Sequence, residues 1–282
     1  MKNNIAVVTD TACDIPDSLI EEYDIRLVPL RVLWKGKDFR DRVELPGADV
    51  FNMMDEEIPK TSLPTQEDFQ SVMDRLADDG AERVLFMTVS SNLSGTNNAV
   101  RIWAEEYARL KITVYDTRSL SMGQGAPVLE AARVIHNGGS IEDAIKRADD
   151  VRRTEGAYYV VRTLEYLKKG GRIGVIEGTL GTLLQIRPVI TVDDAGLFRA
   201  AAKTKGFKRA VSLMVGEIRE KFAGKRIHLS AIHCENMEGA EQLAEEVRSF
   251  ADVVECFVTQ LCPTMSIHTG RGLLGLIAYE MA

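Results

Sequence analysis

The strand–loop–helix pattern of residues 83–110 constrains the fold of this chain more than any other feature. An apolar, β-branched run over 84–89 predicts a buried strand, and a hydroxyl-rich loop over 90–96 follows it. An amphipathic helix is predicted after the loop. One face of that helix comprises Val100, Trp103, Tyr107 and Leu110. Because this order presents backbone N–H groups and a helix N-terminus to a ligand, we expect an α/β fold whose 90–96 loop holds an anion.

The first 155 residues continue this alternation. The strand-like runs are 5–9, 26–34, 84–89 and 112–115. The helical segments are 69–76, 100–110, 128–135 and a further helix capped by Ser140. Since parallel strands are joined by crossover helices, the order predicts a mostly parallel sheet with helices on its faces. We expect residues 1–155 to form one α/β domain.

The pattern restarts after residue 155, which predicts a second α/β domain over 156–282. The expected strands are 157–161, 188–192, 227–232 and 253–259. The expected helices are 164–169, 210–222, 239–250 and a last one near 273–281. Asp193 to Gly196 has the composition of a hairpin turn, so the sheet of this domain is expected to be mixed or antiparallel.

Composition narrows the class of protein. The chain has 282 residues, 45% of them apolar and 27% charged, which is the profile of a soluble globular protein. No stretch approaches the ~18–20 consecutive apolar residues of a membrane span, and the N-terminus lacks a signal-peptide core. A net charge of −7 disfavours a nucleic-acid partner. The scattered cysteines match no metal-ligand spacing, so we expect a cytoplasmic protein with reduced thiols, of which Cys13 is the candidate for reactivity.

The 8–14 and 61–65 segments carry candidate polar groups. Asp10 and Asp14 are interpreted as caps of turns and helix starts, with metal binding or acid–base chemistry as the alternative. Thr65 is predicted to cap the next helix. That assignment gives Thr61 and Ser62 no structural role visible in the sequence, so we expect one of them to contact a ligand, with turn formation as the alternative.

Ser94 invites comparison with a hydrolase nucleophile. A catalytic serine needs a base within hydrogen-bond reach and a group that orients the base, and this loop is not a G-x-S-x-G elbow. His228 and His233 lie in an apolar strand, and His136 lies near a helix end. We therefore interpret Ser94 as a ligand for an anion.

Two segments of the second domain carry further candidates. Arg172 lies among glycines in KKGGRIG and can donate two hydrogen bonds to a phosphate or carboxylate. His268 lies in an expected glycine-flanked loop, where an imidazole can bind one carboxylate oxygen. The alternatives are a helix C-cap with solvated lysines and a structural histidine. Together the segments suggest that hydroxyls hold an anionic head group while apolar side chains bury the remainder.

Several motifs in combination resemble the DegV family of bacterial lipid-binding proteins. They are VVTDTACDIP, TSLPT, SSNLSGT, DTRSLSMGQG, VRTLEYLKKGGRIG, RPVI and the His-containing segment near the C-terminus. The resemblance implies a two-domain DegV-like fold with a long-chain fatty acid buried between or within the domains. It also implies that the carboxylate is held by Thr61 or Ser62, by the Ser94-Gly95-Thr96 loop and by His268.

The family includes the fatty-acid-binding subunits of bacterial fatty acid kinase, so the resemblance implies a role in phospholipid metabolism. In that role the chain is a monomer without catalytic residues or cofactor, and a kinase partner binds ATP. Arg172 and Lys203 are then candidates for contacting the partner or a phosphate. A stand-alone lipid carrier or sensor, or a serine-dependent acyl hydrolase or transferase, remains the alternative. One departure is Arg271, where the family's HxGPG pattern has proline; it adds flexibility and a positive charge beside the expected head group.

Overall fold

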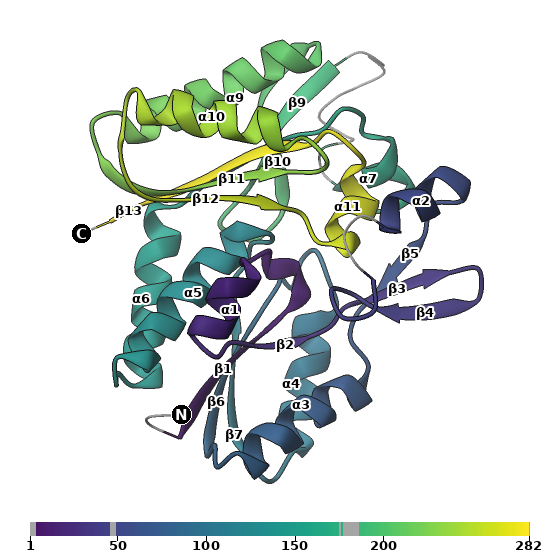
Figure 1. The fold of residues 1–282 in the computed structure, drawn as a ribbon, viewed down its shortest axis with the longest axis vertical. Helices are drawn as coiled ribbons and strands as arrows, with labels where there is room; N and C mark the ends of the chain where they lie inside the picture. Colours follow the sequence, from purple (N-terminus) through teal and green to yellow (C-terminus); the bar gives the residue numbers. More distant parts are fainter. Residues whose placement is uncertain (1–3, 46–48, 175, 177–185, 282) are drawn as a thin grey trace. The chain divides into compact units, whose positions relative to one another are not determined.

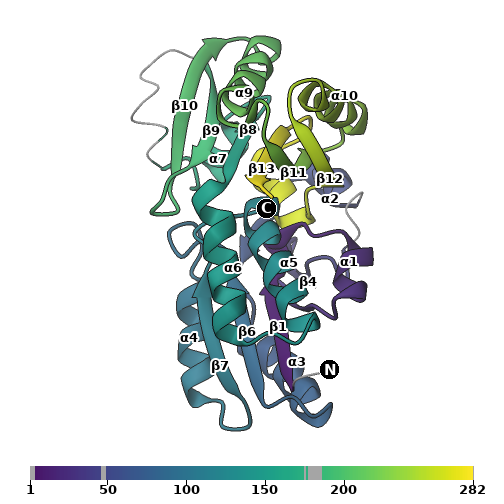
Figure 2. The ribbon, with the colours of Figure 1, turned by 90° about the vertical axis from the view of Figure 1, so that its left-hand side faces the viewer.

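The computed structural model describes residues 4–45, 49–174, 176 and 186–281 of the chain. The chain divides into two compact units. The first comprises Met1–Pro46 and Pro59–Arg153, and the second comprises Gly47–Ile58 and Thr154–Ala282. Each unit has its own sheet (Figures 1 and 2). Each unit also has its own apolar core.

A four-stranded parallel sheet forms the centre of the first unit, as the sequence predicts. Its order is β2-β1-β6-β7. The strands are β1 (Ile5–Asp10), β2 (Arg26–Val28), β6 (Arg83–Thr88) and β7 (Lys111–Asp116). Because every neighbouring pair is parallel, the segments that follow β1, β6 and β7 all leave from one edge of the sheet. That edge holds two of the polar segments singled out in the sequence, 8–14 after β1 and 90–96 after β6.

Helices cover both faces of this sheet. Ala6 and Val8 of β1 share a core with α3 (Gln66–Asp78) and α4 (Thr96–Glu106). The alternate residues Ile5 and Val7 face the end of α5 (Met122–His136), because successive strand side chains point to opposite faces. The remaining helices of this unit are η1 (Thr11–Cys13), α1 (Asp17–Glu22) and α6 (Ile141–Thr154).

A three-stranded antiparallel sheet, β4-β3-β5, extends the first unit and differs from the prediction. The single strand expected over 26–34 is two strands, β2 and β3 (Arg31–Trp34), separated by Pro29, which has no N–H to donate to a ladder. β4 (Lys37–Arg40) and β5 (Lys60–Ser62) flank β3. Thr61 and Ser62 therefore lie in a strand and not in a loop.

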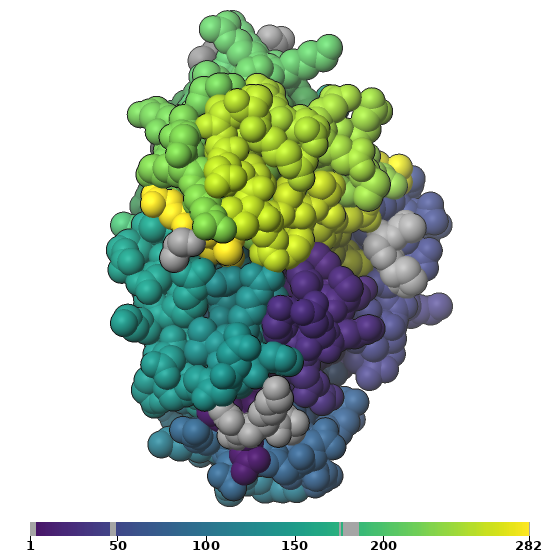
Figure 3. All heavy atoms as spheres, turned by 60° about the vertical axis from the view of Figure 1, so that its left-hand side comes forward, coloured from purple at the N-terminus to yellow at the C-terminus, as the bar shows by residue number. Residues whose placement is uncertain are grey.

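The second unit contains a six-stranded mixed sheet, which confirms the expected sheet type. Its order is β10-β9-β8-β13-β11-β12, and only the β11–β12 pair is parallel. The strands are β8 (Gly156–Val160), β9 (Ile186–Val192), β10 (Phe198–Lys205), β11 (Arg226–His233), β12 (Asp252–Gln260) and β13 (Leu274–Glu280). One face packs against α9 (Phe207–Phe222) and α10 (Met237–Arg248). The outer side of α10 contributes to the yellow-green surface in Figure 3.

The C-terminal segment corrects one prediction. The helix expected near 273–281 is strand β13, which lies between β8 and β11 in the middle of the sheet. A strand buried on both faces is apolar throughout, so its sequence does not show the period of two that identifies a strand. The helix comes earlier, as α11 (Pro263–Thr269) with proline at its start. His268 thus lies in the last turn of a helix, and not in a loop as expected.

Helix α2 (Asp49–Glu56) groups with the second unit, although residues 1–155 were expected to form a continuous domain. Its apolar residues Val50, Phe51 and Met54 are buried, and the helix packs against α11. Helix α7 (Glu165–Lys169) also packs against α11. Among the described residues, no helix has the length and apolar character needed to cross a bilayer.

Candidate ligand site

The 90–96 segment connects β6 to α4 and exposes a hydroxyl at the helix start. Gly95 occupies the N-cap position and has no side chain to cap with. Ser94 supplies the acceptor, because the Thr96 N–H lies 3.3 Å from Ser94 Oγ. The Ser94 and Thr96 hydroxyls are 2.8 Å apart, and either can donate to the other. When Thr96 donates, the half-buried Ser94 hydroxyl is available to donate to an anion at the helix N-terminus.

The Thr61-Ser62 pair lies on β5, and the strand separates its two hydroxyls. Thr61 is opposite Val32 and half-buried, whereas Ser62 is opposite Arg31 and exposed. The next residue, Leu63, reaches the 90–96 segment: a Cβ placed on Gly95 would lie 3.7 Å from Leu63 Cδ2. The structure therefore brings two of the predicted hydroxyl segments together within the first unit.

A buried carboxylate connects the polar segments at this edge of the sheet. Asp10 accepts the backbone N–H groups of Val89, at 2.7 Å, and of Ala12, at 3.1 Å. The side chain of Gln124 donates to the same carboxylate at 3.0 Å. Burial outweighs these hydrogen bonds and raises the pKa of Asp10 to about 6. Asp10 therefore joins the ends of β1 and β6 to α5, which agrees with its interpretation as a structural cap.

Two other acidic groups of the first unit also have structural partners. Ser121 donates to Asp14 at 2.6 Å, and Thr11 donates to Asp41 at 2.6 Å. No group of three or more His, Cys, Asp or Glu side chains that could hold a metal ion occurs among the described residues. Cys13 is fully buried, and burial raises its pKa to about 12, which disfavours the reactive thiolate.

In the second unit, His268 packs against a glycine of the KKGGRIG segment. A Cβ on Gly170 would lie 2.2 Å from His268 Nδ1, so no larger residue fits there without moving the imidazole. Gly171, the next residue, has φ of +71° but open space around it. The two glycines thus have different roles, one making room for a side chain and the other permitting a left-handed backbone.

Arg172 is close enough to influence His268. The guanidinium donates to the Gly170 carbonyl oxygen at 2.6 Å and is exposed. Burial of the imidazole and, second, the nearby charge of Arg172 lower the pKa of His268 to about 4. At neutral pH the imidazole is uncharged and carries one N–H donor.

Lys203 lies on β10, an edge strand with alternating burial, and its side chain is exposed. Its register partner on β9 is Pro188. The basic residues Lys208 and Arg209, which follow β10 in the chain, lie in the first turn of α9. Arg172 and Lys203 are both in the second unit.

A Ser–His–Glu chain that sequence reasoning missed lies on β11 and β12. Ser230 Oγ is 2.8 Å from His228 Nε2, and His228 Nδ1 is 3.0 Å from Glu255 Oε2. The sequence signal that could have revealed this chain is the spacing of His228 and Ser230, which lie two positions apart on one strand and so point to the same face. Ser230 and His228 are both fully buried, and the imidazole stacks on Tyr279 at 4.8 Å. A hydroxyl without solvent access cannot attack a substrate, so this chain serves the core.

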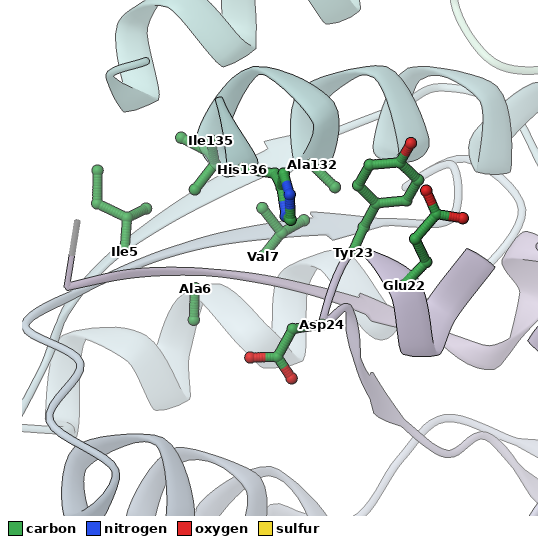
Figure 4. A pocket seen from close by; sticks show the side chains of 9 residues that line it. All are labelled: Ile5, Ala6, Val7, Glu22, Tyr23, Asp24, Ala132, Ile135 and His136. Atoms are coloured by element: carbon green, nitrogen blue, oxygen red, sulfur yellow. The ribbon is translucent and has the colours of Figure 1, made fainter. Parts of the chain in front are cut away.

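A pocket of about 200 Å³ lies in the first unit, near the amino end of β1. Figure 4 shows its lining side chains, which come from the start of β1, the end of α1 and the last turn of α5. The ring centroids of Tyr23 and His136 are 5.5 Å apart at its rim. Because the 90–96 segment follows the carboxyl end of β6, at the opposite edge of the parallel sheet, this pocket is separate from Ser94.

Comparisons with known proteins extend these observations to the whole chain. The family model described as "Uncharacterised protein, DegV family" matches residues 4–281. A DegV domain-containing protein of Clostridium acetobutylicum is 33% identical over 276 residues, covering 98% of this chain and 99% of the relative.

Two solved structures have the same fold. A fatty acid binding DegV family protein from Thermus thermophilus matches with a TM-score of 0.89 and 34% identity, covering 98% of this chain and 99% of that one. DegV from Bacillus subtilis, a fatty acid binding protein, matches with a TM-score of 0.89 and 26% identity, covering 99% and 100%. The fold and its loops define a two-unit α/β protein with a hydroxyl-rich segment at the start of α4. The chain belongs to the DegV family.

Proposed function

We propose that this chain binds a long-chain fatty acid, with the acyl chain buried and the carboxylate held by hydroxyls and an imidazole. The observation that carries the proposal is the match over 98% of the chain to the fatty acid binding protein from Thermus thermophilus. The proposed ligands are Thr61, or Ser62 in its place, the Ser94-Gly95-Thr96 segment and His268.

The chemistry of these groups suits a carboxylate. Ser94 and Thr61 are neutral donors, and the start of α4 adds the positive end of a helix dipole. Burial of the acyl chain contributes about 0.8 kcal/mol per CH₂ group, so the tail provides most of the affinity. The head group then needs orientation more than strong attraction.

His268 supports the same assignment through its charge state. Because burial and Arg172 keep the imidazole neutral, it can donate one hydrogen bond without forming an ion pair. An ion pair would draw electron density from the carboxylate and lower the nucleophilicity of its oxygen atoms. Neutral hydrogen-bond donors lower it less. This property favours presentation of the head group for reaction over tight storage.

We therefore also propose that the chain presents the fatty acid to an ATP-dependent kinase partner, which forms the acyl phosphate. Phosphoryl transfer needs positive charge near the phosphates, and the exposed Arg172 and Lys203 are suitable groups. In this proposal the chain is a non-catalytic substrate-binding subunit, and ATP and Mg²⁺ belong to the partner.

The test of the head-group assignment is a double-mutant cycle with a fluorescent fatty acid. Ser94→Ala and His268→Gln should each weaken binding by about 1–3 kcal/mol, since the first removes a hydrogen-bond donor and the second replaces the fixed imidazole donor with a flexible amide. If both residues hold the same carboxylate, the two losses will be non-additive. Ser91→Ala, in the same segment but exposed, is the control. Additive losses would show that the residues do not share one head group.

The kinase proposal has its own test. Arg172→Ala should leave fatty acid affinity within about threefold, because the residue is not a proposed carboxylate ligand, while acyl phosphate formation with an added kinase partner falls. If the chain is a stand-alone carrier, no acyl phosphate will form with either the natural protein or Arg172→Ala.

A further inference from the structure

Arg271 lies between α11 and β13, three positions after His268 in the chain. Its guanidinium contacts two carboxylates: Nη2 is 2.8 Å from Asp55 Oδ2, and Nε is 3.2 Å from Glu235 Oε2. Its Cζ also lies 5.1 Å from the centroid of the Phe51 ring. The charge of Arg271 is therefore balanced by two acids, which corrects the expectation of a positive charge available to a head group.

Two of these partners belong to α2. This helix has eight residues, and the chain on either side of its segment belongs to the first unit. So short a helix is marginal alone in water, and its place depends on what it packs against. Val50 and Phe51 are 0% and 1% exposed, and α2 lies beside α11 (Figure 1). Arg271 thus connects α2, whose flanking residues belong to the first unit, to the segment that carries His268.

Backbone hydrogen bonds hold the residues that follow α11, Gly272 and Leu273. The N–H of Gly272 donates to the Cys234 carbonyl oxygen at 2.6 Å, and the Cys234 N–H donates to Leu273 at 3.1 Å. These bonds attach the residues after α11 to the end of β11. Glu235, which Arg271 also contacts, directly follows this attachment. Arg271 therefore joins the turn that these bonds attach to β11 to the short helix α2.

We propose that Arg271 is a positioning residue that fastens α2 against α11 and thereby holds His268 in place for the carboxylate. Only an arginine fork can meet two carboxylates and an aromatic face at once; a lysine supplies a point charge. The part of the proposal that concerns the carboxylate rests on the proposed fatty acid function. The fastening of α2 does not.

The first measurement is hydrogen exchange of the 49–56 peptide by mass spectrometry on the full chain. Arg271→Gln should speed exchange of α2 roughly tenfold, the combined effect of two exposed ion pairs and one cation–π contact. Arg271→Lys should give an intermediate rate. The matched control is Arg248→Gln, which removes an equally exposed arginine paired with Glu245 in the same unit and should leave α2 unchanged. High salt should speed α2 exchange in the natural protein but not in Arg271→Gln.

The second measurement is the dissociation rate of a pyrene-labelled fatty acid. Arg271→Gln should raise this rate about fivefold, and Asp55→Asn should raise it less, since it removes one of three contacts. Unchanged α2 exchange in Arg271→Gln overturns the fastening. Faster exchange with an unchanged dissociation rate overturns the positioning of His268. If the natural protein takes up no fatty acid, the proposed function fails, and the exchange result still decides the fastening.

Discussion

At the scale of single residues, β5 distinguishes two hydroxyls that the sequence left equivalent. Thr61 is half-buried beside Val32, and Ser62 is exposed beside Arg31. We predict that Thr61→Val, which keeps the shape and removes the hydroxyl, weakens fatty acid binding by about 1–3 kcal/mol. Ser62→Ala should change it by less than about 0.5 kcal/mol. Titration calorimetry compares the two, and the reverse order would move the head group to the other face of β5.

His268 predicts a pH dependence of stability. Its pKa is about 4 in the folded chain and 6.5 as a model value, so the unfolded chain binds more protons between these values. The contribution of His268 to stability is therefore present above pH 6.5 and is lost as the pH falls toward 4.

The measurement is hydrogen exchange of second-unit peptides at pH 7 and pH 5, corrected for the intrinsic exchange rate. The natural protein should lose more stability between these values than His268→Gln does. Parallel losses in the two proteins would mean that His268 titrates normally. The His228→Gln variant is unsuitable as a control, because His228 pairs with Glu255 in the core.

At the scale of elements, the α7–α11 contact depends on one missing side chain. Gly170→Ala places a methyl group 2.2 Å from the present position of His268 Nδ1, so the imidazole or α7 must shift. We predict at least a tenfold loss of fatty acid affinity, equal to about 1.4 kcal/mol. Gly171→Ala strains a left-handed residue in open space, so it should cost about 1 kcal/mol of stability and leave affinity unchanged. Equal affinities for the two variants would remove the role assigned to Gly170.

The polar edge of the parallel sheet depends in a similar way on Asp10. Asp10→Ala leaves the buried N–H groups of Val89 and Ala12 without their acceptor, which should lower the free energy of unfolding of the first unit by about 2–4 kcal/mol. Both tryptophans, Trp34 and Trp103, belong to this unit, so their fluorescence during urea unfolding reports on it. The exposed Asp78→Ala is the control.

The same carboxylate gives a pH signature of opposite sign to that of His268. Because the pKa of Asp10 is raised from 3.8 to about 6, the folded chain binds the extra proton, and its contribution is lost as pH rises through this window. Asp10→Asn should remove this part of the pH dependence of tryptophan-detected unfolding. An unchanged profile would contradict the raised pKa.

The elements also show which sequence patterns were sufficient to predict secondary structure. The apolar stripe of α9, with Met214, Ile218 and Phe222 all fully buried, could be predicted from the sequence. Apolar residues of a surface helix recur on one face, and polar residues occupy the opposite face. The Thr65–Asp68 capping box was likewise readable, since both of its hydrogen bonds are local. β13 was not, because a central strand covered on both faces has no polar alternation.

At the scale of the whole molecule, the sequence predicted a parallel sheet in the first domain and a mixed sheet in the second. It did not predict that α2 groups with the second unit. A crossing of this kind depends on the burial of Phe51 among residues more than two hundred positions later in the chain, which no local pattern records. The contacts of Arg271 with Asp55 and Glu235 are long-range in the same sense. The position of Ser94 at a helix start was predictable because the 90–96 segment itself sets it, whereas the place of His268 on α11 depended on the strand that follows that helix.

The central claim is that the folded chain binds one long-chain fatty acid. Native mass spectrometry tests it on the purified chain, first as isolated, then after lipid extraction, and finally after addition of oleate or palmitate. We predict a mass increase of one fatty acid per chain, released by extraction, restored by the added lipid and weakened in the Ser94→Ala, His268→Gln double variant. Absence of any acyl chain as isolated, together with no uptake of either added fatty acid, would contradict the account.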